Sequence, residues 1–539
     1  PFAQPATMPR KTQARAPRAQ QIGLAAALAL LLAGATMTRG ADAVAPSPLP
    51  VVAPYDVNNP PQGVFEDEWM ELYISGQKVG YAHESYRRDG DHIFSESQEE
   101  FKIKRLSFVL SATSNLTSEE TLDGVPLSFH SVTDMSDQPV VVDGHGDGKV
   151  FTITKTVGTF KDTQQVTFPE GALMGWGQER LSRLKGLKPG TEYSFYGYDP
   201  GNDAFTALKS NVTVGAREKV SVRGQDVEAS LVAIHLESKS GLGSVDTQTW
   251  VDPNFETVKI AVDMGGLSME MIAATKAEAM GTFVAKDIFS ASLLTINQTV
   301  PDNAQAVTFD LHRTDGQPLP MPPESLTEHG VQLPDGGVAI TLRHAAYPAK
   351  SDPALGAGLP DAAAYLARNS FMDTSDPLLR SLADQAGGPP GTDPVAVAWQ
   401  LRDFVADYIN KKDLSVGFAT ASQAAKSREG DCTEHAVLLA ALGRVRGLPT
   451  RTVSGLVYLP EYDGEKNVLG FHMWSQFYFN GQWMDFDSAV IDGKVPYWRL
   501  GLVASDLDEV SLSDFTLQLM RWMSQLKSTV ASVDLPGKK

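Results

Sequence analysis

The residue whose surroundings most favour nucleophilic chemistry is Cys432. It is the one cysteine among 539 residues, so an intramolecular disulfide and a multi-cysteine metal centre are excluded. Asp431, followed three residues later by Glu434, predicts a capping box, and Gly447 predicts the end of the same helix. Cys432 then lies in the first helical turn, where the helix dipole and the unpaired backbone N–H groups favour a thiolate.

The competing interpretation of Cys432 is a small buried hydrophobic residue, the usual role of a free cysteine. A helix start that follows Gly430 and is flanked by charged residues is a poor place for such burial. We therefore predict that Cys432 is a nucleophile.

A thiolate nucleophile needs a proton carrier and a group that orients it, and one predicted hairpin supplies both. Asn480-Gly481 is a strong two-residue turn signal between two strands of alternating polarity. With these two residues as the loop, Trp474 faces Asp487, and His472 is the diagonal neighbour of Asp487 on the same face. Taken singly, His472 and each of the two aspartates would more often have a structural role than a catalytic one. Their joint arrangement predicts His472 as the base and Asp487, rather than Asp485, as the acid that orients it.

Four motifs then resemble the bacterial transglutaminase-like superfamily over about residues 360–500. They are GDCTEHA at 430–436, RVRGLPTR at 444–451, HMW at 472–474 and WMDFD at 483–487. The resemblance implies a papain-like α+β fold, with Cys432 as nucleophile, His472 as general base and acid, and Asp487 as the orienting residue. The chain departs from the common family pattern at Met473, Gln476 and 488–489, so the resemblance does not define the substrate pocket.

The remaining parts of such a site are less defined by the sequence. The backbone N–H of Cys432 is expected to stabilise the oxyanion, and Gln423 or Tyr408 is a candidate second donor, although packing and surface roles are more common for both. His435 could contact the thiol or serve the structure. A zinc centre built from Cys432, His435, His472 and Asp487 has weak spacing support, so we predict no metal and no cofactor.

Residues 1–43 have the features of a secretory signal. Four basic residues precede an apolar stretch at 22–37, and Ala41-Asp42-Ala43 follows as a small-residue cleavage pattern. The apolar stretch is shorter than the ~20 residues that a spanning helix needs, so membrane attachment is expected only if the segment stays uncleaved. We predict an exported protein, periplasmic or secreted.

The rest of the chain predicts several domains. Residues 44–64 form a proline-rich linker; 65–281 form a β-rich domain, a curved antiparallel sheet or a sandwich; and 282–350 form a small β domain. Residues 359–539 form the catalytic domain, with a helix capped by Asp393 and a C-terminal helix over about 513–526. The apolar stripe of that last helix could contact a membrane surface, but core packing is the commoner role. The predicted fold class is therefore multidomain, with N-terminal antiparallel β domains followed by an α+β papain-like domain.

Charge and composition narrow the function. The chain has 46 Lys and Arg against 65 Asp and Glu, a net charge of -19, which disfavours nucleic acid as a partner. We predict an exported transglutaminase-like cysteine enzyme that transfers acyl groups from peptide or amide substrates. Hydrolysis, as in a protease or amidase, and transamidation share every step except the last, and the abundance of water slightly favours hydrolysis. The alternative is a catalytically silent scaffold or binding protein that acts through its β domains.

Overall fold

The computed structural model describes residues 54–536, except 106–107, 136–138, 202, 238–243, 264–267, 288–292, 412–418, 463, 491–497 and 509–524. The predicted signal segment 1–43 and most of the predicted linker lie outside the described residues. Within the described part of the chain, no helix is both long and apolar enough to cross a membrane.

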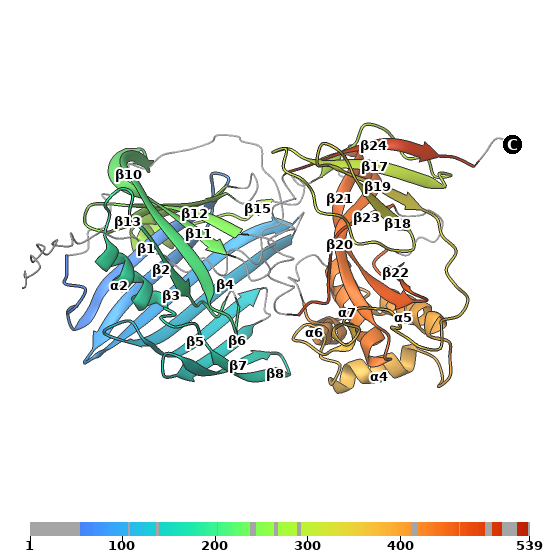
Figure 1. Cartoon of the computed structure of the whole chain (residues 1–539), viewed down its shortest axis with the longest axis horizontal. Coiled ribbons are helices and arrows are strands. Elements are labelled where there is room, and N and C mark those ends of the chain that lie inside the picture. The colour runs from blue at the N-terminus through green and yellow to red at the C-terminus, as the bar shows by residue number, and fades with distance from the viewer. Residues whose placement is uncertain are drawn as a thin grey trace, which may run out of the picture.

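The N-terminal half is one large antiparallel sheet that curves around helix α2 (Gly175–Lys185), as Figure 1 shows. Its strand order is β8-β7-β6-β5-β4-β3-β2-β1-β14-β13-β12-β11-β10-β9, and β15 pairs in parallel with β3. A short helix, α3 (Lys276–Ala279), follows β14. The strands are β1 (Gly63–Ile74), β2 (Gln77–Asp89), β3 (His92–Arg105), β4 (Phe108–Thr121), β5 (Pro126–Met135), β6 (Val140–Gly146), β7 (Val150–Val157), β8 (Phe160–Thr167), β9 (Glu192–Gly197), β10 (Leu208–Val222), β11 (Gln225–Glu237), β12 (Ser244–Val251), β13 (Thr257–Asp263), β14 (Ser268–Ala274) and β15 (Lys286–Asp287).

Turn residues set the register of this sheet. The predicted turn at Ser75-Gly76 is confirmed, since β1 ends at Ile74 and β2 begins at Gln77. Both turn residues have positive φ, as a two-residue hairpin requires. The second predicted turn is displaced by one residue, because β2 continues through Asp89 and the chain reverses after it.

Helix α2 begins against the sheet without a side-chain cap of its own. Glu120 of β4 supplies the cap instead: its carboxylate accepts the N–H groups of Trp176 at 2.9 Å and Gly177 at 2.8 Å. Burial raises the pKa of Glu120 to about 7, and the N–H donors oppose that shift. A carboxylate at a helix N-terminus is favourable, and this one ties α2 to the sheet.

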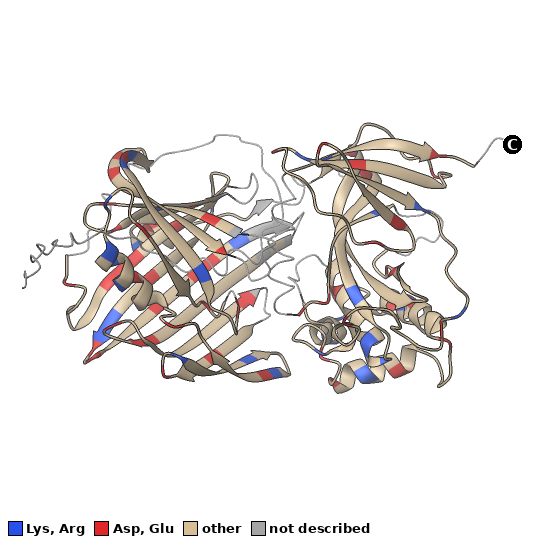
Figure 2. Cartoon of the chain, in the orientation of Figure 1, with Lys and Arg blue, Asp and Glu red and all other residues tan. Residues whose placement is uncertain are grey.

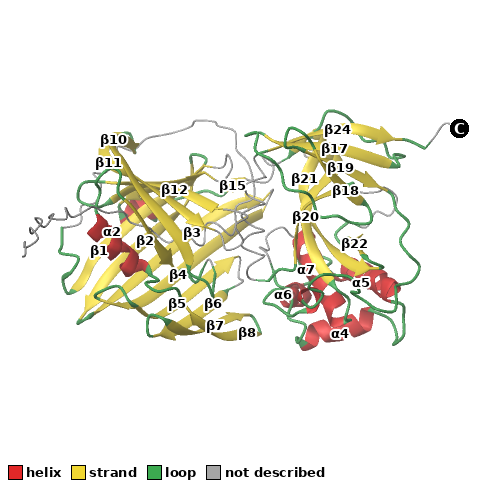
Figure 3. Cartoon of the chain, viewed as in Figure 1, coloured by secondary structure: helices red, strands yellow, loops and turns green. Residues whose placement is uncertain are grey.

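The C-terminal half combines helices with two smaller sheets, and Figure 3 shows that most helices lie there. One sheet has the order β16-β21-β20-β23, with β22 pairing with β21, and the other has the order β18-β19-β17-β24. The elements are β16 (Leu294–Thr295), β17 (Ala306–Arg313), β18 (Glu328–Gln332), β19 (Val338–Arg343), η2 (Ala364–Leu366), α4 (Pro377–Ala386), α5 (Pro394–Tyr408), α6 (Ala421–Ser427), α7 (Cys432–Val445), β20 (Thr450–Tyr462), β21 (Glu465–Phe479), β22 (Gln482–Phe486), β23 (Arg499–Ser505) and β24 (Leu526–Asp534). The predicted class, antiparallel β-structure followed by an α+β domain, is confirmed.

Two hydrophobic cores hold this half together. One lies between the helices and β21 and β22, and includes Leu438, Phe477 and Phe486. The other lies between the small sheet and the β16–β23 sheet, and includes Phe309 and Leu500. Because β21 contributes to both cores, it connects the helical layer with the small sheet (Figure 1).

The predicted C-terminal boundary of the catalytic domain is wrong. Residues 526–534 form strand β24, which pairs with β17 of the small sheet. The predicted helix over 513–526 lies outside the described residues except at its end, where Leu526 begins this strand. Buried Leu526, Ser528 and Val530 alternate with exposed neighbours, which is the period of a strand. The small β domain therefore includes this late segment, whereas β16 of the predicted 282–350 range joins the β20–β21 sheet.

Replacing Glu120 with Ala should destabilise the N-terminal domain by about 1–3 kcal/mol, because two backbone donors at the start of α2 lose their acceptor. Urea unfolding followed by tryptophan fluorescence measures this change. The matched control is Glu96→Ala, an exposed position on β3, which should change stability by less than about 0.5 kcal/mol. Equal effects of the two substitutions would contradict the capping role.

Candidate active site

Helix α7 begins at Cys432, as predicted, and a full capping box fixes this start. Asp431 accepts the N–H of Thr433 at 2.8 Å, and Glu434 accepts the N–H of Asp431 at 3.0 Å. Gly430 has a φ of +152°, and a Cβ there would lie 2.3 Å from Cβ of Glu434. The turn before Cys432 therefore requires glycine, and the thiol is held at the N-terminal end of α7.

The hairpin of β21 and β22 has the predicted register. Phe479 pairs with Gln482 and Gln476 pairs with Asp485. Asn480 and Gly481 both have positive φ, as this turn type requires. His472 on β21 and Asp487, one residue after the end of β22, consequently reach the same side of the hairpin.

The helix and the hairpin are locked together next to these residues. The hydroxyl of Ser475 donates to the carbonyl oxygen of Ala436 at 2.7 Å, which joins β21 to the first turns of α7. Further along, a Cβ at Gly443 would lie 2.6 Å from the ring of Phe477, so glycine allows the two elements to approach closely. This contact fixes the position of Cys432 relative to His472.

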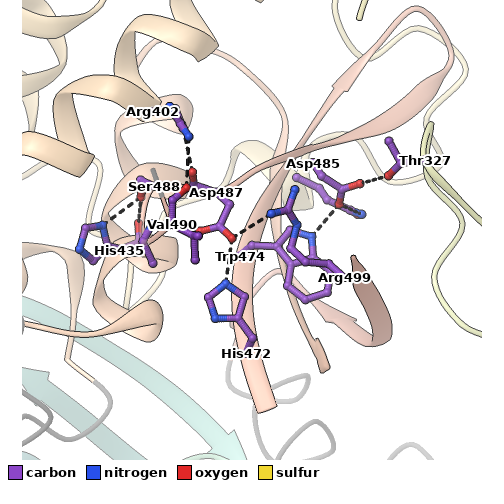
Figure 4. A network of polar contacts seen from close by, with 12 residues as sticks. Thr327, Arg402, His435, His472, Trp474, Asp485, Asp487, Ser488, Val490 and Arg499 are labelled. Carbon is purple, nitrogen blue, oxygen red and sulfur yellow. Dashed lines mark hydrogen bonds and ion pairs between the residues drawn. The ribbon is translucent and has the colours of Figure 1, made fainter. Parts of the chain in front are cut away.

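The structure brings the three predicted residues together. Nε2 of His472 lies 2.8 Å from Oδ2 of Asp487, and the side chains of Cys432 and His472 are hydrogen-bonded. Figure 4 shows His472 directed at Asp487 from the neighbouring strand. The side chains of His472 and Asp487 are only 8% and 4% exposed. Since Asp487 occupies Nε2, Nδ1 is the ring nitrogen available for proton exchange with the thiol.

Charges at this site favour an imidazolium. Burial lowers the pKa of His472, but Asp487 and Cys432 outweigh it and raise the pKa to about 10. Burial raises the pKa of Asp487, but His472 and Arg499 outweigh burial and hold that pKa well below its usual range. The two shifts describe one buried ion pair, in which His472 is charged and able to act as an acid.

Two arginines that the sequence analysis did not identify hold Asp487 in place. Nη1 of Arg499 lies 3.2 Å from Oδ2 of Asp487. Arg402 on α5 donates to the backbone carbonyl oxygens of Asp487 at 2.8 Å and Val490 at 3.2 Å (Figure 4). Arg499 lies 12 residues after Asp487, whereas Arg402 precedes all three residues of the triad. No local pattern links either arginine to Asp487, and the order of the strands and helices reveals both.

Asp485, the rejected alternative, has a structural role. It accepts hydrogen bonds from the Trp474 indole at 2.6 Å, the Gln476 amide at 2.8 Å and the hydroxyls of Ser325 and Thr327. Gln476 also accepts from Arg451 at 2.7 Å. An amide at position 476 can donate to Asp485, whereas a glutamate could not, which explains this departure from the family pattern.

The other candidates are also engaged in structural contacts. Gln423 closes the capping box of α6 by accepting from Thr420, and the hydroxyl of Tyr408 donates to the Ala425 carbonyl at 2.8 Å. Buried His435 lies 3.3 Å from the Ser488 hydroxyl, next to Asp487. Among the described residues, no cluster of three or more His, Cys, Asp or Glu side chains could hold a metal ion.

Comparison with protein families agrees with this geometry. Residues 381–488 match the family model of the transglutaminase-like superfamily. These residues form a transglutaminase-like core. The match includes Cys432, His472 and Asp487 and ends one residue after Asp487. No curated protein sequence matches the chain significantly.

Three solved structures are similar to parts of the chain. A β-barrel-like protein of a domain of unknown function from Brucella abortus has 15% identity and a TM-score of 0.31, covering 39% of this chain and 95% of that one. A proposed cysteine protease from Cytophaga hutchinsonii has 15% identity and a TM-score of 0.26, covering 40% and 78%. A proposed protease from Parabacteroides distasonis has 11% identity and a TM-score of 0.18, covering 56% and 68%.

Alkylation by iodoacetamide tests the pairing of thiol and imidazole in the transglutaminase-like core. Cys432 should react readily below pH 7, because a neighbouring imidazolium stabilises the thiolate. In His472→Ala the rate at pH 6.5 should fall by up to about 100-fold, toward that of a thiol that ionises near about pH 8.5. Because the chain has one cysteine, the mass of the adduct reports on this site alone. Identical rates in the two proteins would contradict the pairing.

The ion pair also makes stability depend on pH. The pKa of His472 is raised from 6.5 to about 10, so its contribution is complete below pH 6.5 and is lost as the pH rises through 10. The pKa of Asp487 is lowered from 3.8, so its contribution is present above pH 3.8 and is lost as the pH falls further. The pair is most stabilising between these limits.

Asp487→Asn should therefore cost about 3 kcal/mol of unfolding free energy at pH 5.5 and clearly less at pH 10.5, as measured by urea denaturation. Ser475→Ala is the matched control on the same hairpin. The partner of the Ser475 hydroxyl is the Ala436 carbonyl oxygen, which does not titrate, so the cost of this substitution should be the same at both pH values. A cost for Asp487→Asn that did not change with pH would refute the ion pair.

Proposed function

We propose that the chain is an exported cysteine enzyme that transfers the acyl group of a peptide or carboxamide through a thioester on Cys432. The observation that carries the proposal is the connected series of Cys432, His472 and Asp487, in which a thiol at a helix start meets a buried histidine-aspartate pair. The match of residues 381–488 to the transglutaminase-like superfamily supports the same class of chemistry.

In the first half of the reaction, the Cys432 thiolate attacks the carbonyl carbon of the substrate. The carbon–nitrogen bond of the tetrahedral adduct then breaks while His472 donates its proton to the leaving nitrogen. The products are a thioester on Cys432 and free ammonia or amine. Asp487 keeps the His472 ring oriented and stabilises its charged form before the transfer.

The oxyanion of the adduct needs hydrogen-bond donors near the start of α7. As the first residue of the helix, Cys432 has a backbone N–H that is not used in the helical hydrogen-bond ladder. We assign this group as one donor, and the positive end of the helix dipole adds to its effect.

In the second half of the reaction, His472 removes a proton from the acceptor, which attacks the thioester. The carbon–sulfur bond breaks, the thiolate is restored, and the acyl group leaves as an acid if water is the acceptor or as a new amide if an amine is. We propose water as the principal acceptor, because it is present at far higher concentration than any amine.

Trapping of the thioester with hydroxylamine tests the reaction without knowledge of the natural acceptor. Incubation with a pool of glutamine-containing peptides and hydroxylamine should give peptide hydroxamates, detected by mass spectrometry. Cys432→Ala and His472→Ala should lower the rate by at least about 10³-fold, because nucleophile and base act as one unit.

The matched control for this assay is Asp485→Asn, which should retain most of the hydroxamate yield when folded protein is compared. If alkylation shows a reactive thiol and no peptide or amide in the pool gives hydroxamate, the proposed acyl transfer fails for these substrates. A thiol that is both unreactive and without turnover would favour the silent scaffold instead.

Export is a separate part of the proposal, supported by the order of basic, apolar and small residues in 1–43. N-terminal sequencing of the protein recovered from a bacterial periplasm or from the medium should give a start near Val44. Recovery of unprocessed chain from the cytoplasm alone would contradict it.

A further inference from the structure

The N-terminal domain contains a cavity that the proposed reaction does not use. The cavity lies inside the curve of the large sheet, between helix α2 and strands from both arms of the sheet, has a volume of about 110 Å³ and opens to solvent. A cavity of about 150 Å³ is enough for a molecule of the size of benzene. This cavity therefore has room for a short alkyl group, and its opening lets the rest of a ligand extend toward solvent.

Much of its wall is apolar. Aliphatic side chains from β4 and from the neighbouring strands β10 to β13 line it, among them Leu116, Leu208, Ile234, Val245 and Ile260. The alternation of these strands directs such residues inward, as the buried Val232 and Ile234 of β11 show. An occupant therefore needs an apolar body.

The charged groups of the wall all have one sign. Glu84 and Asp199 line the cavity, and none of the described residues that line it is Lys or Arg. Arg183 of α2 pairs instead with Glu66 at 3.0 Å and with Glu179. Figure 2 shows acidic residues on several strands of this domain. Acidic groups in the wall disfavour an anionic ligand such as a fatty acid or a phosphate.

Two further polar side chains at this site are buried without hydrogen-bond partners in the described part of the chain. The Ser210 hydroxyl is in the wall and is 1% exposed. Glu99 is 2% exposed, and neither of its carboxyl oxygens has a partner. Glu99 lies two residues after Ser97 on the same face of β3, and Ser97 is itself part of the wall.

Glu84 and Glu99 are close enough to affect each other. In the register of β2 and β3, Glu84 pairs with Ser97, which makes Glu99 its diagonal neighbour. Burial raises the pKa of Glu84 to about 8 and raises that of Glu99 well above its usual range, with repulsion from Asp199 and Glu84 adding to the effect on Glu99. Glu84 accepts a hydrogen bond from the Tyr86 hydroxyl at 2.5 Å, whereas Glu99 has no hydrogen-bond partner in the described part of the chain. A cation placed between the two carboxyl groups would favour their charged forms.

We propose that this cavity binds a lipophilic amine, a small molecule with an apolar body and one protonated nitrogen. The apolar part contacts the aliphatic wall, the ammonium group donates to Glu84 and Glu99, and Ser210 accepts or donates a further hydrogen bond. The proposal concerns a site distant in sequence from Cys432 and does not depend on the reaction proposed above.

Fluorescence titration with dansylcadaverine tests the site directly, because its primary amine is on a pentyl chain that can enter the cavity while the dansyl group stays at the opening. The full chain carrying Cys432→Ser is used, so that binding cannot be confused with turnover. The expected result is saturable binding with a blue-shifted emission. The matched carboxylate, dansyl-6-aminohexanoic acid, should bind at least about tenfold more weakly, because its charge has the wrong sign.

Two substitutions locate the ammonium group. Glu84→Gln and Glu99→Gln should each weaken dansylcadaverine about tenfold or more, since each removes a charge-assisted hydrogen bond. Neither should lower the melting temperature, because glutamine preserves the shape of the neutral carboxyl group that the raised pKa values favour without a ligand. The control is Glu96→Gln on the exposed face of β3, which should leave binding unchanged. Ser210→Leu, which fills the cavity, should abolish binding of every probe.

The same chemistry is present in a lysine side chain of a protein. Competition against bound dansylcadaverine distinguishes the two sources. Displacement by hexylamine but not by a lysine-containing peptide assigns the site to free amines. Displacement by the peptide but not by hexylamine assigns it to a protein lysine. Absence of saturable binding, equal binding of the amine and the carboxylate, or equal effects of Glu96→Gln and Glu99→Gln would each overturn the proposal.

Discussion

The close contact between helix α7 and strand β21 is the constraint on which the rest of the candidate site depends. The thiol belongs to α7 and the imidazole to β21, so the packing of these two elements sets the distance between the thiol and the imidazole. Gly443 permits the approach, Phe477 fills the space that it leaves, and the Ser475 hydroxyl fixes the sliding position by bonding to the Ala436 carbonyl. The caps of α7 then orient its first turn, and the arginines around Asp487 complete the arrangement from a third and a fourth element.

The two halves of the molecule treat buried charge in different ways. Near Cys432 the buried carboxylates have oppositely charged partners or hydrogen-bond donors. Asp487 lies next to His472 and Arg499, and Glu434 accepts two backbone N–H groups. In the N-terminal domain Glu120 is satisfied in the same manner by α2, whereas Glu99 is not satisfied at all among the described residues. Buried polar groups in folded proteins are nearly always paired, so an exception at the edge of a cavity points to a function outside the domain's own stability.

Local signals carried much of what could be predicted from the sequence. Asp431 and Glu434 defined the start of α7, and Asn480-Gly481 defined the hairpin register, which in turn distinguished Asp487 from Asp485. These signals act between residues a few positions apart. Arg402, Arg499 and the cap that Glu120 gives to α2 depend on strand order and on packing between distant segments, which no local pattern encodes. Leu526 was assigned to a helix from its spacing to preceding residues, although the alternation that follows it is that of a strand. The catalytic roles of Cys432, His472 and Asp487 remain predictions that the geometry supports.

The pairing of β24 with β17 has a consequence for how the chain reaches its native state. These strands are separated by more than 200 residues, and the whole α7–β23 region lies between them. A ribosome delivers β17 long before β24, so the small sheet is left with an uncovered edge while the intervening residues are made. The small sheet can therefore be completed only after residues 526–534 have been made, and its strand order depends on a contact that forms across more than 200 residues of sequence.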